Sequence, residues 1–133
     1  MRYLWMAALV SISLFSAFAA VAGDHEYACR VLQVYDLAAN GQLRSSAWDE
    51  VMKDGSFIVS RDTGDIVGQV LPTALAKSVG VVNRGSKQNA FKAVADFGEQ
   101  FQIIEIQEFR DGPVKPFVAS SMGGAGIVSG VCR

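Results

Sequence analysis

The stretch SFIVSRDTGDIVGQVL, residues 56–71, decides the fold class of this chain. Two short runs rich in β-branched and aromatic residues, 57–61 and 66–71, flank the polar connection Asp62-Thr63-Gly64-Asp65. A short polar connection that contains glycine is typical of the loop in an antiparallel β-hairpin. The stretch therefore predicts a hairpin, and Pro72 ends its second strand because proline has no N–H to donate to a sheet ladder.

Apolar runs of similar length, separated by similar turn residues, continue along the rest of the chain. They predict strands over residues 27–37, 79–82, 90–97, 101–109, 117–120 and 127–132, with turns at Asn40-Gly41, Gly98-Glu99 and 110–113. Ser45-Ser46 before Asp49-Glu50 favours a short helix near 46–53, or an irregular loop, with Trp48 as its buried anchor. The repeated strand and turn predict an all-β fold, a single antiparallel barrel or compact sandwich of about seven or eight strands.

The hydrophobic pattern also predicts which side chains face the core. In residues 90–97 one face carries Phe91, Ala93, Ala95 and Phe97. The next run is ambiguous, because Phe101 and Ile103 share one phase while the isoleucines that follow occupy the other. We expect Phe91, Phe97, Phe101 and Ile103 in the core, with a bulge near Ile103-Ile104 or a strand covered on both faces.

Residues 1–22 have the pattern of a cleaved signal peptide. Arg2 supplies the positive start, residues 4–20 carry no charge, and Ala20-Val21-Ala22 offers the small residues of a cleavage site. A membrane anchor is the alternative, but the run is short for about 20 spanning residues and no basic cluster follows it. We expect cleavage after Ala22 or Ala19, a single periplasmic or secreted domain over residues 23–133, and no stable membrane span.

Both cysteines, Cys29 and Cys132, lie near the two ends of this exported part. An even number of cysteines in an oxidising compartment favours a disulfide, the alternative being two free or intermolecularly paired thiols. The bond would close a loop of about 100 residues and place the first and last strands side by side.

The inventory of catalytic and charged residues excludes most chemistries. The chain has 13 acidic and 12 basic residues, interspersed, so no basic stripe indicates nucleic acid. The one histidine, His25, lies near the expected mature N-terminus, and no cluster of residues has metal-ligand spacing. The glycines of residues 123–126 precede a strand rather than a helix, which makes them a connection and not a phosphate loop. We expect no enzyme activity, metal or cofactor, with a carboxylate-dependent hydrolase as the minor alternative.

Two polar loops supply the candidate contacts with a partner. The candidates are Arg61, Asp62 and Thr63 in the first loop, and Asn83, Arg84 and Lys87 in the second. Binding residues are often carried by loops on a rigid scaffold, although ordinary solvated turns have the same composition. We expect an exported binding protein of the bacterial envelope, acting on a protein partner or a small ligand. The alternative is a structural or assembly accessory of the envelope, held by pairing at a strand edge.

The chain also resembles a known class of exported proteins. Its size, its export, its β pattern and the segments Tyr27-Ala28-Cys29 and Ser129-Gly130-Val131-Cys132 are similar to those of small periplasmic lysozyme inhibitors of Gram-negative bacteria. The resemblance implies inhibition of lysozyme as a further alternative and carries no site residue over.

Three structural features distinguish the functional hypotheses. A cavity with polar and apolar walls favours a small ligand, a filled core with an exposed apolar patch favours a protein partner, and an uncharged free edge strand favours assembly.

Overall fold

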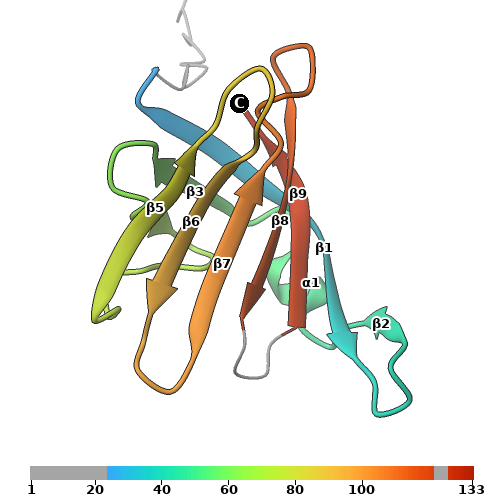
Figure 1. Cartoon of the computed structure of the whole chain (residues 1–133). Coiled ribbons are helices and arrows are strands. Elements are labelled where there is room, and N and C mark those ends of the chain that lie inside the picture. The colour runs from blue at the N-terminus through green and yellow to red at the C-terminus, as the bar shows by residue number, and fades with distance from the viewer. Residues whose placement is uncertain (1–23, 122–125) are drawn as a thin grey trace, which may run out of the picture.

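The computed structural model describes residues 24–121 and 126–133, and nearly all of its regular structure is β-strand (Figure 1). The elements are β1 (Glu26–Leu37), β2 (Leu43–Ser45), α1 (Asp49–Met52), β3 (Ser56–Ser60), β4 (Ile66–Gly68), β5 (Ser78–Arg84), β6 (Phe91–Asp96), β7 (Phe101–Ile106), β8 (Lys115–Ser121) and β9 (Gly126–Cys132). The all-β prediction and the predicted helix near 46–53 are confirmed. The predicted signal peptide lies outside the described residues, as do residues 122–125 of the glycine-rich connection.

A single antiparallel sheet runs in the order β4-β3-β1-β9-β8-β7-β6-β5, and β2 pairs with β1 beside this path. The sheet curls into a half-barrel, so that β5, β6 and β7 face β1 and β3 across its interior (Figure 1). In the described part of the chain, the two end strands β4 and β5 do not pair with each other. One face of the sheet is therefore concave and holds the core, and the other face is convex.

The first and last strands are neighbours, as the two cysteines predicted. Cys29 lies opposite Cys132 in the β1–β9 ladder, and the two are joined by a disulfide. Beyond this bond, Ala28 and Arg133 exchange two backbone hydrogen bonds of 2.8 Å each. The disulfide thus joins two strands that are already paired and closes a sequence separation of 103 residues.

A β-bulge in β1 lets two valines that are three positions apart both face the concave side. The register against β9 shifts just after Val31, so that Val31 and Val34 both point inward and are 0% and 1% exposed. Opposite the bulge the strands approach closely at Gly130. A Cβ atom added there would lie 2.0 Å from the carbonyl oxygen of Arg30 and 2.7 Å from the ring of Phe117. Glycine is therefore required at this position because no side chain fits.

The concave face is packed with aliphatic and aromatic side chains from both halves of the sheet. Phe57 and Phe117 meet edge to face with ring centroids 5.2 Å apart, the favourable geometry for an aromatic pair. The segment after β4 packs against this core, where Val70 and Thr73 are buried. There Thr73 Oγ1 accepts a hydrogen bond from the N–H of Ile66 at 2.8 Å.

The predicted core face of β7 is wrong. Phe101 and Ile103 point outward and are 45% and 37% exposed, while Gln102, Ile104 and Ile106 are buried. The β6–β7 register is continuous, so the predicted bulge is absent from it. Gln102 can face inward because its Nε2 donates a hydrogen bond of 2.8 Å to the Leu71 carbonyl, which satisfies a polar group in the core. The predicted burial of Phe91 is confirmed at 0% exposure, and Phe97 is half-buried.

Two predictions near the hairpin also differ from the structure. The second hairpin strand, β4, ends at Gly68 and not at residue 71, because Gly68 has φ +147° and lies against the backbone of β3. Trp48 is 57% exposed, so it does not anchor the segment before α1. The carboxylate of Asp49 holds α1 instead, since its Oδ1 accepts a hydrogen bond of 2.8 Å from the N–H of Val34 in β1.

Candidate functional site

The two polar loops predicted as candidate contacts lie at the same end of the sheet (Figure 1). We call this region, residues 24–27, 61–65, 84–90 and 107–114, the loop end. Arg84 donates from Nη2 to Oδ1 of Asp62 at 2.5 Å, and His25 Nδ1 lies 3.0 Å from Oδ2 of Asp62. The three side chains are exposed, by 78% for His25, 46% for Asp62 and 68% for Arg84. Asp62 therefore links segments that are far apart in the sequence.

This exposed cluster sets the charge state of Asp62. The hydrogen bond from Arg84 lowers the pKa of the Asp62 carboxyl below its ordinary value, and His25 acts in the same direction. Exposed ion pairs contribute little to fold stability because water and salt screen them. The cluster therefore mainly orients the two loops, and Asp62 stays ionised at neutral pH.

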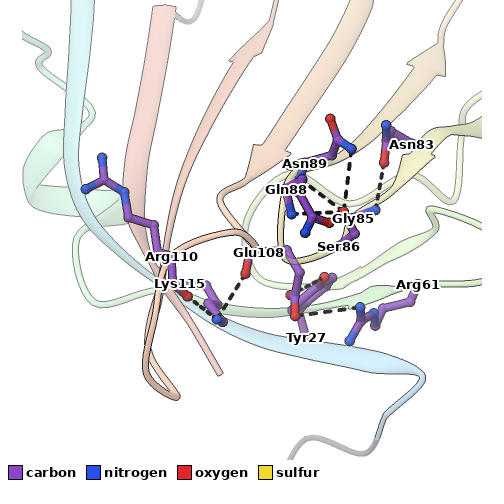
Figure 2. Close-up of polar contacts among 10 residues, drawn as sticks. All are labelled: Tyr27, Arg61, Asn83, Gly85, Ser86, Gln88, Asn89, Glu108, Arg110 and Lys115. Atoms are coloured by element: carbon purple, nitrogen blue, oxygen red, sulfur yellow. Dashed lines mark hydrogen bonds and ion pairs between the residues drawn. The ribbon is translucent and has the colours of Figure 1, made fainter.

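Arg61 turns away from the loop tip and joins a partly buried polar cluster (Figure 2). Its guanidinium carbon lies 4.7 Å from the ring centroid of Tyr27, and its Nη2 lies 3.8 Å from Oε1 of Glu108. The Tyr27 hydroxyl donates a hydrogen bond of 2.7 Å to Oε2 of Glu108. Burial, reinforced by this hydrogen bond, raises the pKa of Tyr27 above its ordinary value. Tyr27 is thus a neutral donor, and Arg61 packs on it with a quarter of its side chain exposed.

Two other predicted contacts hydrogen-bond within their own turns. The Thr63 hydroxyl donates to Oδ2 of Asp65 at 2.7 Å. Asn83 Oδ1 accepts a hydrogen bond of 2.9 Å from the N–H of Gly85 (Figure 2). Both side chains therefore shape the loops that carry them, as short polar residues commonly do in turns.

Lys87 lines a surface cleft of about 460 Å³ together with Ser86, residues 108–112 and Lys115. A second cleft, of about 170 Å³, lies beside it and shares Glu108 and Lys115. Lys115 lines both clefts, and its Nζ donates to the carbonyl oxygens of Glu108 at 3.1 Å and of Arg110 (Figure 2). Glu108, Arg110 and Lys115 were not expected at a site, because the sequence predicts Glu108 within a strand and Arg110 within a turn. The signal that could have found them is the charge density of EFRDGPVK, residues 108–115.

Neither cleft carries charge of a single sign. Both are lined by lysine or arginine side chains together with carboxylates. Clefts that attract polyanions or cations by long-range electrostatics are lined by one sign of charge. The loop end is therefore a mixed polar surface without a marked preference for either sign.

The interior of the half-barrel has no room for a small ligand beneath the β3–β4 loop. The cavity there, lined by Gly64, Ile66, Thr73, Ala93, Val94, Ala95, Gln102 and Ile104, has a volume of about 10 Å³. This is about the least space that a single water molecule needs. The concave face is thus filled by its own side chains.

The convex face carries a row of uncharged, exposed or partly exposed residues across six strands. In register from β5 to β1 the row is Gly80, Val94, Ile103, Ser120, Ile127 and Tyr35. Phe101 and Val118 lie beside this row and are 45% and 40% exposed. We call Val94, Phe101, Ile103, Val118 and Ile127 the convex patch. Lys92 and Glu105, an ion pair of 3.5 Å between β6 and β7, border it.

Residues 24–121 and 126–133 contain no cluster of three or more histidine, cysteine, aspartate or glutamate side chains arranged to hold a metal ion. In the same part of the chain, no helix has the length and apolar character needed to cross a membrane. Comparisons with known protein families, with curated proteins and with solved structures find no match to this chain.

Proposed function

We propose that this chain is an exported, non-enzymatic binding protein of the bacterial envelope and that its ligand is another protein. The observation that carries the proposal is the convex patch on a sheet whose concave face is filled. Sites for small molecules enclose roughly 300–1,000 Å³ and are lined mostly by apolar side chains. The cavity beneath the β3–β4 loop, about 10 Å³, is far smaller, and the loop-end cleft of about 460 Å³ is lined mainly by charged side chains. A contiguous exposed apolar patch with a polar border is typical of a protein-binding surface.

The dimensions of the uncharged row suit a protein partner. Adjacent strands lie about 4.8 Å apart, so the row from Gly80 to Tyr35, whose middle four strands carry the convex patch, is about 24 Å long. A standard protein interface covers about 800 Å² on each partner, a region of similar width. Such interfaces have an apolar centre and a polar rim, which matches the convex patch and the bordering pair of Lys92 and Glu105.

This proposal is tested by comparing which proteins are captured from envelope extract by the unaltered domain and by variants of the convex patch. The bait is the domain of residues 23–133 with Ile103→Lys, and its matched control is Val51→Lys on α1, where the valine is 71% exposed. We expect Val51→Lys to retain the protein captured by the unaltered domain and Ile103→Lys to lose it, with equal thermal melts. If both variants retain it, or no protein is captured specifically, the convex patch is not the binding surface.

One observation also favours the second candidate, a structural or assembly accessory of the envelope. β5 ends the sheet, is seven residues long and carries no charge before Arg84. An exposed edge of this kind is a template for pairing with another chain. An accessory protein held in an assembly by such pairing would also bind proteins. Both candidate functions therefore have another protein as the partner.

A further inference from the structure

β5 presents a free edge of backbone hydrogen-bonding groups. It is the last strand of the sheet and pairs with β6 alone. Within the described residues, no backbone hydrogen bond outside the strand ladders joins residues 78–84 to another segment. The N–H and C=O groups on its outer side therefore remain available to a further strand.

This edge lacks most of the features that protect the edges of natural sheets. Residues 78–83 contain no charged residue and no proline, and the one irregularity is a bulge between Val81 and Asn83. The opposite edge, β4, is three residues long and ends at Gly68. Short edge strands resist pairing, whereas a long uncharged one invites it. Of the two edges, β5 is the one to which a strand can add.

Charged residues bracket this uncharged edge at both ends. Lys77 precedes the strand, is exposed and forms no ion pair with the described residues. Arg84 ends the strand and is held by Asp62. If two copies paired antiparallel about the centre of residues 77–84, Lys77 would lie opposite Arg84 of the second copy. Like charges in directly opposed positions destabilise a strand pair, so a different chain with acidic residues fits this edge better.

Exposed apolar side chains near both ends of β5 would also be buried by an added strand. Leu75, just before β5, is 90% exposed, and Val82 is 68% exposed. Val79 and Val81 are half-buried on the inner side, where Gly64 of the β3–β4 loop lies against them. An added strand would cover Val82 without entering the filled core.

We propose that β5 binds an extended segment of the partner protein by strand addition. The segment has an uncharged, β-branched centre and an acidic residue opposite Lys77. This inference rests on the proposed function and specifies the chemistry of the partner. Backbone hydrogen bonds to β5 provide the affinity in this mode, and the end charges and alternate side chains provide the specificity.

A synthetic peptide tests the strand addition directly. The probe is acetyl-Asp-Thr-Val-Thr-Val-Thr-Val-Asp-amide, added up to about 1 mM to the ¹⁵N-labelled domain of residues 23–133, a range in which weak complexes are measurable. We expect amide shifts confined to β5 and the facing residues of β6. Exchange of both terminal aspartates for lysine should weaken binding about fivefold. Lys77→Glu should reverse that preference, whereas the control Lys53→Glu, an exposed lysine after α1, should keep it.

N-methylated peptides distinguish backbone pairing from side-chain docking. An antiparallel or parallel strand uses alternate amides toward its neighbour, so one set of alternate N-methyl groups should abolish binding and the other set should leave it intact. Equal binding by both N-methylated peptides, or no shift with the parent peptide, overturns strand addition. If strand addition fails in this way, a captured protein that is lost in Ile103→Lys still supports the proposed function. The peptide experiment and the capture experiment therefore test the two proposals independently.

Discussion

Phe91 and Phe101 lie on opposite faces of the β6–β7 hairpin. Truncating each to alanine measures how much the side chains on the concave and convex faces contribute to the free energy of unfolding. Phe91 is 0% exposed, and its ring centroid lies 5.2 Å from that of Tyr27. Phe91→Ala leaves an enclosed cavity in the concave core, which typically lowers the free energy of unfolding by about 3–5 kcal/mol. This loss is a large fraction of the roughly 5–15 kcal/mol that stabilises a domain.

Phe101→Ala should have a much smaller effect. The side chain is 45% exposed on the convex patch, so its removal leaves no enclosed cavity. Full burial of such a side chain is worth roughly 1.5–3 kcal/mol, and only about half of its surface is covered here. We therefore expect a loss of about 1 kcal/mol.

Urea unfolding of the oxidised domain, followed by circular dichroism, gives both values under one set of conditions. Equal losses for the two variants, or a larger loss for Phe101→Ala, would refute the assignment of faces in β7. That result would also remove Phe101 and Ile103 from the convex patch and with them the basis of the proposed function. A stable Phe101→Ala variant that captures less partner would instead connect the exposed ring with binding.

Three further predictions concern the closure of the sheet and the loop end. Replacing Cys29 and Cys132 together by alanine should lower stability by at most about 4.7 kcal/mol, the chain-entropy value for a separation of 103 residues, as measured by urea unfolding. Gly130→Ala should destabilise the domain because β9 approaches β1 too closely there for a side chain, and a melt at or above that of the unaltered domain would contradict this. The Asp62 carboxyl should titrate below 3.8 by NMR and return toward that value in Arg84→Ala. Because its pKa is lowered on folding, its contribution to stability is present above the unfolded pKa and is lost as the pH falls through the folded pKa.

The fold class, the disulfide and the β6 core face could be predicted because each depends on a local or unambiguous signal. In β6, Phe91, Ala93 and Ala95 form one phase, and the other phase carries the charges of Lys92 and Asp96 beside Val94, so the first phase faces the core. In β7 each phase combines two apolar residues with one polar residue, Glu105 in one phase and Gln102 in the other. A sequence pattern assigns Gln102 to the surface. Its inward position depends on the Leu71 carbonyl, 31 positions away in the sequence.

The arrangement of the loop end and of the convex patch could not be predicted for a related reason. The link between Asp62 and Arg84 depends on how far the sheet curls, and no local pattern encodes this curvature. The exposed side chains of the convex patch look like core residues in the sequence because alternation does not say which face is covered. The six loop residues identified from the sequence do lie near one another, but Arg61 packs inward, and Thr63 and Asn83 hydrogen-bond within their own turns.

Hydrogen–deuterium exchange of the domain with the partner captured from envelope extract tests the central claim most directly. We predict slower exchange in β5, β6 and β7 upon binding, since their convex face and the free edge become covered. Residues 61–65 and 107–114 should exchange at the rate of the free domain. Protection confined to those loop-end segments, with β5 to β7 unchanged, would contradict binding through the convex patch and the β5 edge.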